Sequence, residues 1–204
     1  MDKNIWDTIH NKYTDKKVYS DNWMDKYLKD LDKESFILDL GCGLGNDTKE
    51  LLDLGYKVFS SDYSQVALEY VKNKFRRASV VNFDMRSHFP FSSKSFDMIV
   101  ADLSLHYFSS EETIKVMKEI KRVLKENGIL IARVNSINDI NYGSLSKDII
   151  EKHYFMVDGY NKRFFDNEDI KKYFSYAGKI LSINETELHR YEKTKYVYEV
   201  EVKK

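Results

Sequence analysis

Proline and cysteine are almost absent from this sequence, and glycine is scarce. The 204 residues include one proline, one cysteine and eight glycines. So little proline and glycine predicts long regular elements without a flexible linker, because these two residues most often interrupt helices and strands. The lone cysteine, Cys42, excludes an intrachain disulfide and a cysteine-based zinc cluster, and it is typical of a reducing compartment. We therefore expect a cytoplasmic protein.

The sequence also lacks an excess of charge and a long apolar run. Lysine plus arginine and aspartate plus glutamate number 33 each, so the formal net charge is zero and no basic excess indicates a nucleic-acid partner. No stretch has the apolar length that spans a bilayer, and the first residues lack the apolar core of a signal peptide. We expect neither a membrane nor a nucleic-acid partner, and the oligomeric state stays open.

An apolar segment followed by closely spaced glycines is the most informative feature that is present. Residues 36–40 read Phe-Ile-Leu-Asp-Leu, and the chain continues as Gly41-Cys42-Gly43-Leu44-Gly45. The apolar segment predicts a buried parallel strand, and the glycines let the backbone approach a ligand because they carry no side chain. A second apolar run ends in Asp62. Together these features predict a nucleotide-type pocket.

Strands and helices alternate from residue 36 to residue 135. Strands are predicted at 36–40, 57–62, 80–84, 96–102 and 129–135. Capping boxes are predicted at Asp47 with Glu50 and at Ser109 with Glu112, and Ser64 predicts the start of the helix between them. We expect the helix that starts at Ser109 to end at Asn127-Gly128.

This alternation predicts an α/β fold with a Rossmann-like, doubly wound sheet, because parallel neighbours need crossover connections. After residue 165 we expect a helix over 166–177 and then an antiparallel hairpin at the sheet edge, which brings the total to seven strands. We expect one domain, 1–204. Its parts are an N-terminal helical cap (1–35), a cofactor-binding core (36–135), an insertion that forms a substrate lid (136–165) and a helix with the terminal hairpin (166–204).

The glycine turn reads DxGxGxG rather than the dinucleotide fingerprint GxGxxG, since Asn46 stands where that fingerprint has its third glycine. With the terminal hairpin, this pattern resembles the class I S-adenosylmethionine-dependent methyltransferase family, in particular its small-molecule type with methyltransferase domains 11 and 25. The segment 123–128, VLKENG, is similar to the family's turn VLKPGG. The resemblance covers residues 36–135 on these motifs.

The resemblance implies S-adenosyl-L-methionine as cofactor, S-adenosyl-L-homocysteine as product and no metal. It implies that Asp62 accepts hydrogen bonds from both ribose hydroxyls and that Asp84 binds the adenine amino group. A carboxylate suits the first role because it offers only acceptors. The cofactor-binding residues expected on this basis are Tyr13, Asp39, Gly41, Cys42, Gly43, Gly45, Asn46, Asp47, Asp62, Tyr63, Asp84, Met85, Ala101, Asp102 and Leu103.

Two further segments contain candidate residues for binding or activating the methyl acceptor. The sequence after Asp102 lacks the Asn/Asp-Pro-Pro-Tyr signature of enzymes that methylate planar amino groups, and His106 is the candidate general base because its ordinary pKa lies near neutrality. The alternative is that His106 packs over the cofactor or holds the loop. In the aromatic insertion, the candidate substrate residues are Tyr142, Tyr160 and Arg163, and the alternative is that they only pack the insertion against the sheet.

The sequence thus favours a methyltransferase that acts on a small-molecule acceptor. A non-catalytic S-adenosylmethionine-binding protein, serving as a sensor or subunit, is the alternative because no residue is decisive as a base. A nicotinamide oxidoreductase is disfavoured by the glycine spacing, and an aminopropyl transferase is disfavoured because the acidic cluster expected for a polyamine acceptor is missing.

Overall fold

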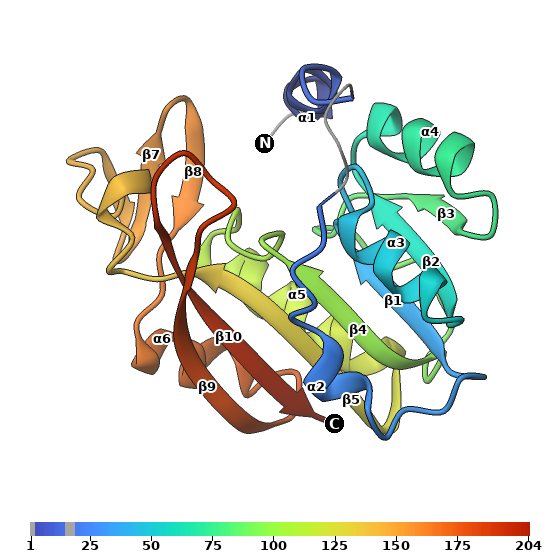
Figure 1. Ribbon diagram of the computed structural model, residues 1–204. Helices are drawn as coiled ribbons and strands as arrows, with labels where there is room; N and C mark the ends of the chain where they lie inside the picture. Colours follow the sequence, from blue (N-terminus) through green and yellow to red (C-terminus); the bar gives the residue numbers. More distant parts are fainter. Residues whose placement is uncertain (1–2, 15–18) are drawn as a thin grey trace.

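Seven strands form the central sheet of the computed structural model, which describes residues 3–14 and 19–204. Their order is β3-β2-β1-β4-β5-β10-β9 (Figure 1). The first five strands pair in parallel, and β10 is antiparallel to both β5 and β9. The expected Rossmann-like α/β fold with its antiparallel C-terminal strand is confirmed. The strands are β1 (Phe36–Leu40), β2 (Lys57–Asp62), β3 (Ser79–Asn82), β4 (Phe96–Asp102), β5 (Leu124–Asn135), β9 (Lys179–Leu188) and β10 (Lys195–Lys203).

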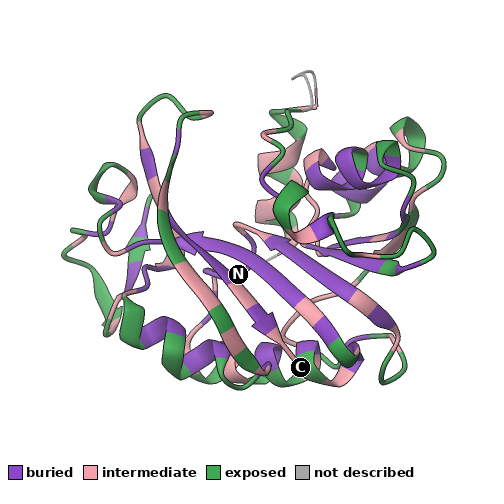
Figure 2. Cartoon of the chain, turned by 60° about the horizontal axis from the view of Figure 1, so that its bottom comes forward, coloured by how far each residue is buried: buried purple, intermediate pink, exposed green. Residues whose placement is uncertain are grey.

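Successive residues of the central strands point to opposite faces of the sheet, as the period of a strand requires. Ile37 belongs to an apolar cluster that includes residues of α2 (Asp25–Leu28) and α3 (Asn46–Asp53). Its neighbour Leu38 belongs to a second cluster, with α5 (Ser110–Val123) and α6 (Asn167–Phe174). The sheet is therefore the middle of three layers, and Figure 2 shows its central strands as mostly buried.

The helix starts follow the expected caps at two positions out of three. The Ser64 side chain accepts a hydrogen bond from the backbone N–H of Ala67 at the start of α4 (Gln65–Lys74), and Ser109 with Glu112 forms both bonds of a capping box on α5. The prediction for Asp47 and Glu50 is wrong, because α3 already begins at Asn46 after Gly45, whose φ is 81°. Tertiary partners take these two carboxylates instead: Asp47 accepts from the Trp23 indole at 3.1 Å, and Glu50 accepts from the Ser20 hydroxyl.

Several element boundaries differ from the sequence prediction, and α6 ends at Phe174 instead of residue 177. β3 ends at Asn82, so Asp84 lies in the loop beyond it. α5 ends at Val123 and β5 begins directly at Leu124, which pairs with Phe96, while Ile129 pairs with Met98. The residues between these pairs bulge out, and Asn127 takes a φ of 62° there. The expected VLKENG turn is thus a bulge at the start of a strand.

The insertion 136–165 contains regular structure. It consists of a 3₁₀ helix, η1 (Ile140–Tyr142), and a three-stranded antiparallel sheet of β6 (Ile149–Glu151), β7 (Tyr154–Val157) and β8 (Tyr160–Arg163). Asp158 and Gly159 form the two-residue turn between β7 and β8, with φ values of 53° and 82°. Positive φ at both turn residues matches the twist of a tight hairpin, so this turn sets the β7–β8 register.

The N-terminal part contributes α1 (Lys3–Asn11) and α2. Figure 1 shows α1 above the ends of the strands, between α4 and the β7–β8 hairpin. Residues 1–2 and 15–18 of the expected N-terminal cap lie outside the described residues. In the part of the chain that the structure describes, no helix combines the length and the apolar character needed to cross a membrane.

Replacement of Ile120 by alanine tests the layered packing. Ile120 is fully buried between α5 and the sheet, so its truncation should lower the free energy of unfolding by about 2–5 kcal/mol. Leu145 is 73% exposed, and Leu145→Ala should change it by less than about 0.5 kcal/mol. Denaturant titration of both variants measures the difference, and equal losses would contradict the three-layer packing.

Candidate functional site

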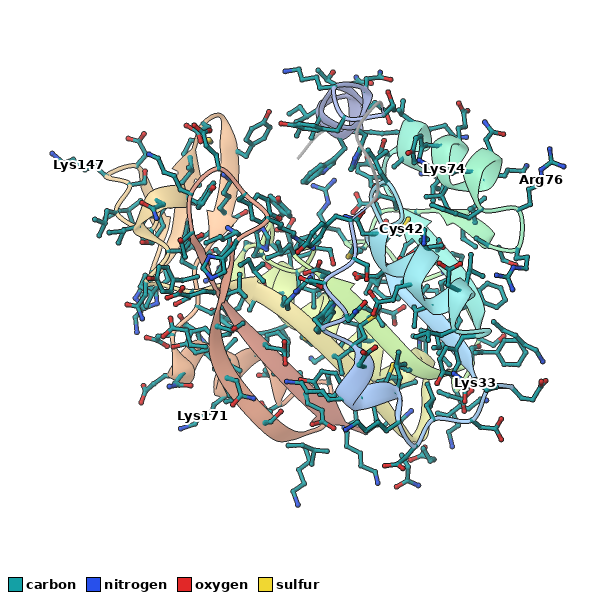
Figure 3. The ribbon with its side chains drawn as sticks, in the orientation of Figure 1. Lys33, Cys42, Lys74, Arg76, Lys147 and Lys171 are labelled. Carbon is teal, nitrogen blue, oxygen red and sulfur yellow. The ribbon has the colours of Figure 1, made fainter. Side chains whose placement is uncertain are left out.

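A cavity of about 550 Å³ lies at the carboxyl ends of β1, β2 and β4. Parallel strands present their carboxyl ends at one edge, which is where open α/β sheets bind ligands. Figure 3 shows Cys42 at this edge, whereas Lys33, Lys147 and Lys171 lie at the periphery. The lining includes Trp6, His10, Tyr13, Gly41, Cys42, Gly43, Asn46, Asp47, Asp62, Tyr63, Asp84, Met85, Arg86, Asp102, Leu103, Tyr107, Glu112, Tyr154, Tyr160, Asn161, Arg190 and Tyr191.

The glycine turn brings bare backbone to the cavity wall. Gly41 has a φ of 79°, and a Cβ added there would lie 2.4 Å from the Cβ of Ser104. Gly43 has a φ of 50°, and a Cβ there would lie 3.3 Å from Cε1 of His10. Side chains rarely adopt such φ values, and at Gly41 there is also no space for one. The turn requires glycine at both positions, and its backbone lines the cavity.

Asp62 connects this turn to the next helix. Its Oδ2 accepts a hydrogen bond from the N–H of Gly43 at 2.9 Å, and its Oδ1 accepts from the N–H of Ser64 at 2.8 Å. A carboxylate oxygen can accept more than one hydrogen bond. The carboxylate is therefore fixed at the end of β2 with acceptor capacity left for a ligand hydroxyl in the cavity.

Asp84 and Met85 lie beside each other on the cavity wall, next to Tyr63. Arg86 binds the Asp84 carboxylate, with Nη2 at 2.6 Å from Oδ2 and Nε at 3.0 Å from Oδ1. Burial alone would raise the pKa of Asp84, but the bonds and charge of Arg86 outweigh it and hold that pKa below its ordinary value. Asp84 is thus an ionised acceptor in the cavity.

A network of two arginines and two aspartates lies at the ends of β4 and β5. Arg133 donates to both carboxylate oxygens of Asp102 at 2.7 and 2.6 Å and to Asp21 at 2.7 Å. Arg190, from the turn between β9 and β10, donates to Asp102 at 2.7 Å. Burial favours protonation of Asp102, but the two guanidinium groups keep its pKa below the ordinary value. The network places Asp102 and Arg190 in the cavity wall.

Helix α1 covers the cavity with one of its faces. Its Trp6 ring contacts the Tyr107 ring edge-on, with centroids 4.6 Å apart. Asp7 accepts a hydrogen bond from the Ser64 hydroxyl at 2.6 Å, which joins α1 to the start of α4. Burial lowers the pKa of His10 against the opposing charges of Asp62 and Asp7. His10 therefore faces the cavity as a neutral imidazole near pH 7.

Three residues expected at the cofactor lie behind the cavity wall rather than in it. Asp39 is buried and accepts from the Thr48 hydroxyl at 2.5 Å, because α3 packs over it. Gly45 begins α3, and a Cβ there would meet Phe75. Ala101 is buried in the sheet core. These residues support the wall, whereas the other expected cofactor residues, from Tyr13 to Leu103, line the cavity.

Three candidate residues for acceptor chemistry are not among the residues that line the cavity. His106 is 2% exposed, and burial together with the charges of Lys195 and Lys162 lowers its pKa well below the ordinary value. Arg163 is fully buried and donates to Glu151 at 2.7 Å. Tyr142 contacts the β9–β10 turn through Lys193. Of the acceptor candidates only Tyr160 lies in the cavity.

Sequence reasoning missed Arg190 and Tyr191 of the β9–β10 turn. A signal for them existed, because β10 runs antiparallel to β5 and therefore begins where β5 ends. The turn before β10 must then lie at the ligand-binding edge. The positions of Glu112 and Asn161 in the cavity were also missed, because a capping box and a short hairpin do not indicate a ligand site.

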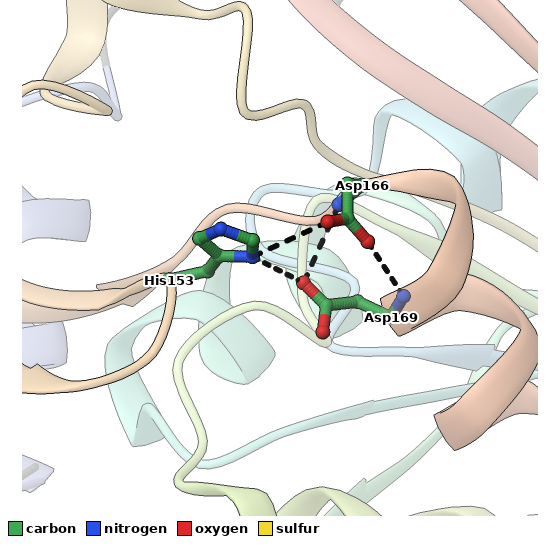
Figure 4. Close-up of side chains that lie close together, drawn as sticks. All are labelled: His153, Asp166 and Asp169. Atoms are coloured by element: carbon green, nitrogen blue, oxygen red, sulfur yellow. Dashed lines mark hydrogen bonds and ion pairs between the residues drawn. The ribbon is translucent and has the colours of Figure 1, made fainter.

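A separate group of potential metal ligands lies beyond the cavity (Figure 4). The Nδ1 of His153 is 2.6 Å from Oδ2 of Asp169 and 3.7 Å from Oδ2 of Asp166. One ligand atom from each of the three residues lies within 4.8 Å of the others. Asp166 and Asp169 also form the capping box of α6. The geometry is therefore that of a helix cap that His153 ties to the insertion.

The sheet order, the terminal hairpin and the glycine-walled cavity at the carboxyl edge define a Rossmann-like cofactor-binding fold. Residues 38–132 match the family model of a methyltransferase domain. A SAM-dependent methyltransferase from Methanosarcina mazei superposes with a TM-score of 0.73 at 20% identity, covering 85% of this chain and 94% of that one. Over residues 38–132 the chain is therefore similar to a methyltransferase domain, and its fold is that of a solved SAM-dependent methyltransferase.

One curated relative and one further solved structure are similar over most of this chain. The tRNA N(3)-cytidine methyltransferase METTL2 of Danio rerio is 29% identical over 155 residues, which are 70% of this chain and 44% of that protein. The 1,6-didemethyltoxoflavin-N1-methyltransferase of Burkholderia thailandensis, solved with that compound and S-adenosylhomocysteine, has a TM-score of 0.72 at 14% identity and covers 99% of this chain and 86% of its own. The chain spans about half the length of the curated relatives it matches.

Replacement of Asp62 by alanine tests its role in the cavity. The change removes a carboxylate acceptor, and a hydrogen bond to a carboxylate contributes about 1.5–3 kcal/mol, so S-adenosylhomocysteine should bind roughly 10- to 100-fold more weakly. Isothermal titration calorimetry gives the Kd. Asp53→Ala, at an exposed position of α3, is the control. An unchanged Kd in Asp62→Ala would show that this carboxylate only holds the glycine turn.

The pH dependence of stability tests the burial of Asp39. Burial raises the pKa of Asp39 to about 7, and the nearby Asp102 and Asp62 carboxylates add to this while the Thr48 hydroxyl opposes it. The folded state keeps a proton that the unfolded chain loses near pH 4, so the Asp39 contribution to stability is highest below pH 4 and falls as the pH rises to about 7. Asparagine cannot ionise. The unfolding free energy of Asp39→Asn relative to wild type should therefore rise by a few kcal/mol between pH 4 and pH 7.

Denaturant titrations at pH 4, 5.5 and 7 measure this difference. Asp53→Asn serves as the surface control and should show no such trend. A constant difference between wild type and Asp39→Asn across this range would mean that Asp39 ionises in the folded state as it does in the unfolded chain.

Proposed function

We propose that this chain binds S-adenosyl-L-methionine in the cavity and transfers its methyl group to a small-molecule acceptor held under α1 and the insertion. The observation that carries the proposal is that a single cavity contains both halves of such a site. One half is the glycine turn with Asp62, Asp84 and Met85, and the other is the aromatic and polar wall from the insertion and the β9–β10 turn.

The residues of the first half fit the cofactor. Gly41 and Gly43 leave the backbone bare where the ligand must approach closely. Asp62 keeps acceptor capacity for the ribose hydroxyls, and Asp84 is an ionised acceptor for the adenine amino group. When bound, the cofactor supplies a methyl group already activated on a sulfonium, so the protein mainly has to align the acceptor and exclude water.

The residues of the second half enclose the acceptor. Trp6 and Tyr107 close one side through their edge-on contact. Glu112 and neutral His10 also line the cavity and can accept a proton from an acceptor that must lose one. The volume of about 550 Å³ is within the range of small-molecule pockets. His106 has no part in this proposal because it lies behind the wall.

Methylation of a tRNA base is the second candidate function. It is favoured by the similarity to METTL2, a tRNA N(3)-cytidine methyltransferase. The zero net charge gives no general attraction for RNA, so we place the small-molecule acceptor first.

The activity itself is tested by the release of S-adenosylhomocysteine. Purified protein is incubated with S-adenosylmethionine and a panel of thiols, amines, phenols, carboxylates and nitrogen heterocycles, with unmodified tRNA in a parallel arm. We expect release above the acceptor-free rate with at least one small molecule, and loss of that release in Asp62→Ala. Release with tRNA alone would support the second candidate. Tight cofactor binding without release in any arm would favour a non-catalytic sensor or subunit.

A further inference from the structure

Asn161 presents an unsatisfied hydrogen-bond acceptor in the acceptor half of the cavity. It lines the cavity, and its Oδ1 is buried without a hydrogen-bond partner among the described residues. A buried acceptor left unpaired costs about 1–3 kcal/mol. The oxygen is therefore suited to a donor that a ligand brings.

The orientation of the Asn161 amide follows from its neighbour Tyr154. The Tyr154 hydroxyl donates its hydrogen to the backbone carbonyl of Tyr107 at 3.2 Å, and a carbonyl can only accept. The same hydroxyl is also hydrogen-bonded to the Asn161 side chain. Since its hydrogen is already donated, its oxygen accepts from the Asn161 NH₂ group, and Oδ1 faces away from Tyr154. Burial raises the pKa of Tyr154, and the hydrogen bond with Asn161 opposes that rise, as a donated bond would.

The β7–β8 hairpin fixes this arrangement. Asn161 pairs with Met156, and Arg163 pairs with Tyr154. Paired residues and those two positions away share a face of an antiparallel pair, so Tyr154 and Asn161 are diagonal neighbours on one face. The Arg163 guanidinium lies 4.9 Å from the centre of the Tyr154 ring and packs against it. The amide is thus supported by a short-turn hairpin and not by a free loop.

Glu112 provides a second acceptor near the same tyrosine. Its Oε2 accepts from the N–H of Ser109 at 2.9 Å as part of the α5 capping box. It lines the cavity together with Tyr154 of the insertion and Arg86 of the cofactor half. A carboxylate has more acceptor positions than this one bond uses. Asn161 Oδ1 and the Glu112 carboxylate are therefore two cavity-lining acceptors that can bind donors of a ligand.

The surrounding walls are aromatic. Tyr107, Tyr160 and Tyr191 line the cavity with Asn161, and Trp6 packs edge-on against Tyr107. Aromatic side chains favour planar ligands because rings gain from stacked or edge-to-face contact beyond the area they bury. The same walls offer little to a flexible aliphatic chain that carries no ring.

We propose that the methyl acceptor is a planar nitrogen heterocycle with an exocyclic amino group, which donates hydrogen bonds to Asn161 Oδ1 and Glu112. This inference rests on the proposed function, since it names the substrate class of that site. Asn161 selects the acceptor because a ligand without the donor leaves Oδ1 unpaired, and buried groups that lose their partner give large discrimination. The same heterocycle can come as a free compound or as a nucleobase in RNA.

The test compares ligands that differ only by a donor. Protein saturated with S-adenosylhomocysteine is titrated with 4-aminopyrimidine and 4-methylpyrimidine, and with adenine and 6-methylpurine, and Kd values are measured by protein-observed NMR. In each pair a methyl group replaces an amino group of similar size. We expect the amino compound to bind at least about 10-fold more tightly to the wild-type protein.

Three variants locate the preference. Asn161→Leu keeps the side-chain size and removes the acceptor, so the preference should disappear. Glu112→Gln keeps the capping box and removes the charge, so the preference should fall without disappearing. Asn73→Leu makes the same exchange at an exposed position of α4 and should behave like wild type. Because Glu112→Gln preserves the fold of α5, it keeps the test decisive if Asn161→Leu does not fold.

The outcomes separate this inference from the proposed function. Failure of S-adenosylhomocysteine to bind would overturn the proposed function. Normal binding of S-adenosylhomocysteine together with equal affinity for both members of each pair, or a preference that persists in Asn161→Leu, would overturn the assignment of Asn161 alone. Methyl transfer to the free amino heterocycles identifies the free source, and transfer only to tRNA in a competition with them identifies the nucleobase source.

Discussion

The burial of the Arg133 charge is the constraint around which the ligand-binding edge is arranged. The Arg133 side chain is 1% exposed, and a guanidinium can be buried at tolerable cost only if carboxylates and hydrogen bonds balance it. Asp102 supplies two of these bonds from β4, and Asp21 supplies one from the segment before α2. The centre of the Trp23 ring lies 4.4 Å from the Arg133 guanidinium carbon. One buried cation thus draws the N-terminal segment and two strands to the same point.

The cavity carries more acidic than basic groups. Asp47, Asp62, Asp84, Asp102 and Glu112 line it, against Arg86 and Arg190. Burial and the neighbouring Asp102 and Asp39 raise the pKa of Asp47 well above its ordinary value, which reflects crowding of like charges. Such a cavity attracts cations. On the proposed function this creates an asymmetry, because the methyl donor carries a sulfonium charge and the product is a neutral thioether. The same field that draws the donor in holds the product less strongly.

Sequence patterns predicted the sheet well because its signals are local. Each central strand is a short apolar run. The two predicted helix caps that form, at Ser64 and Ser109, each involve only a residue and its partner three positions later. The start of α3 could not be read in this way, since Asp47 and Glu50 have the cap pattern but bond instead to Trp23 and Ser20, which are distant in sequence. The β6–β7–β8 sheet also has no apolar alternation to reveal it, because its strands have only three or four residues.

For the site, too, local sequence patterns indicated some residues and missed those whose position depends on distant parts of the chain. Residues at strand ends, such as Asp62 and Asp102, were placed correctly in the cavity because a parallel sheet collects strand ends at one edge. His106 of a loop and Arg163 of the short strand β8 have suitable chemistry but are buried, and no local sequence pattern shows which way such side chains point. Arg190 reaches the cavity through a hairpin whose partner strand lies about 60 residues earlier, a relation that follows from topology.

Helix α1 has no fully buried residue, although it forms part of the cavity wall. Its attachments include the bond from Asp7 to α4 and the ring contact of Trp6 with Tyr107. A helix without a fully buried residue is expected to open at a lower free energy than the sheet beneath it. A ligand that fills the cavity and contacts α1 would therefore stabilise this helix more than it stabilises the seven strands.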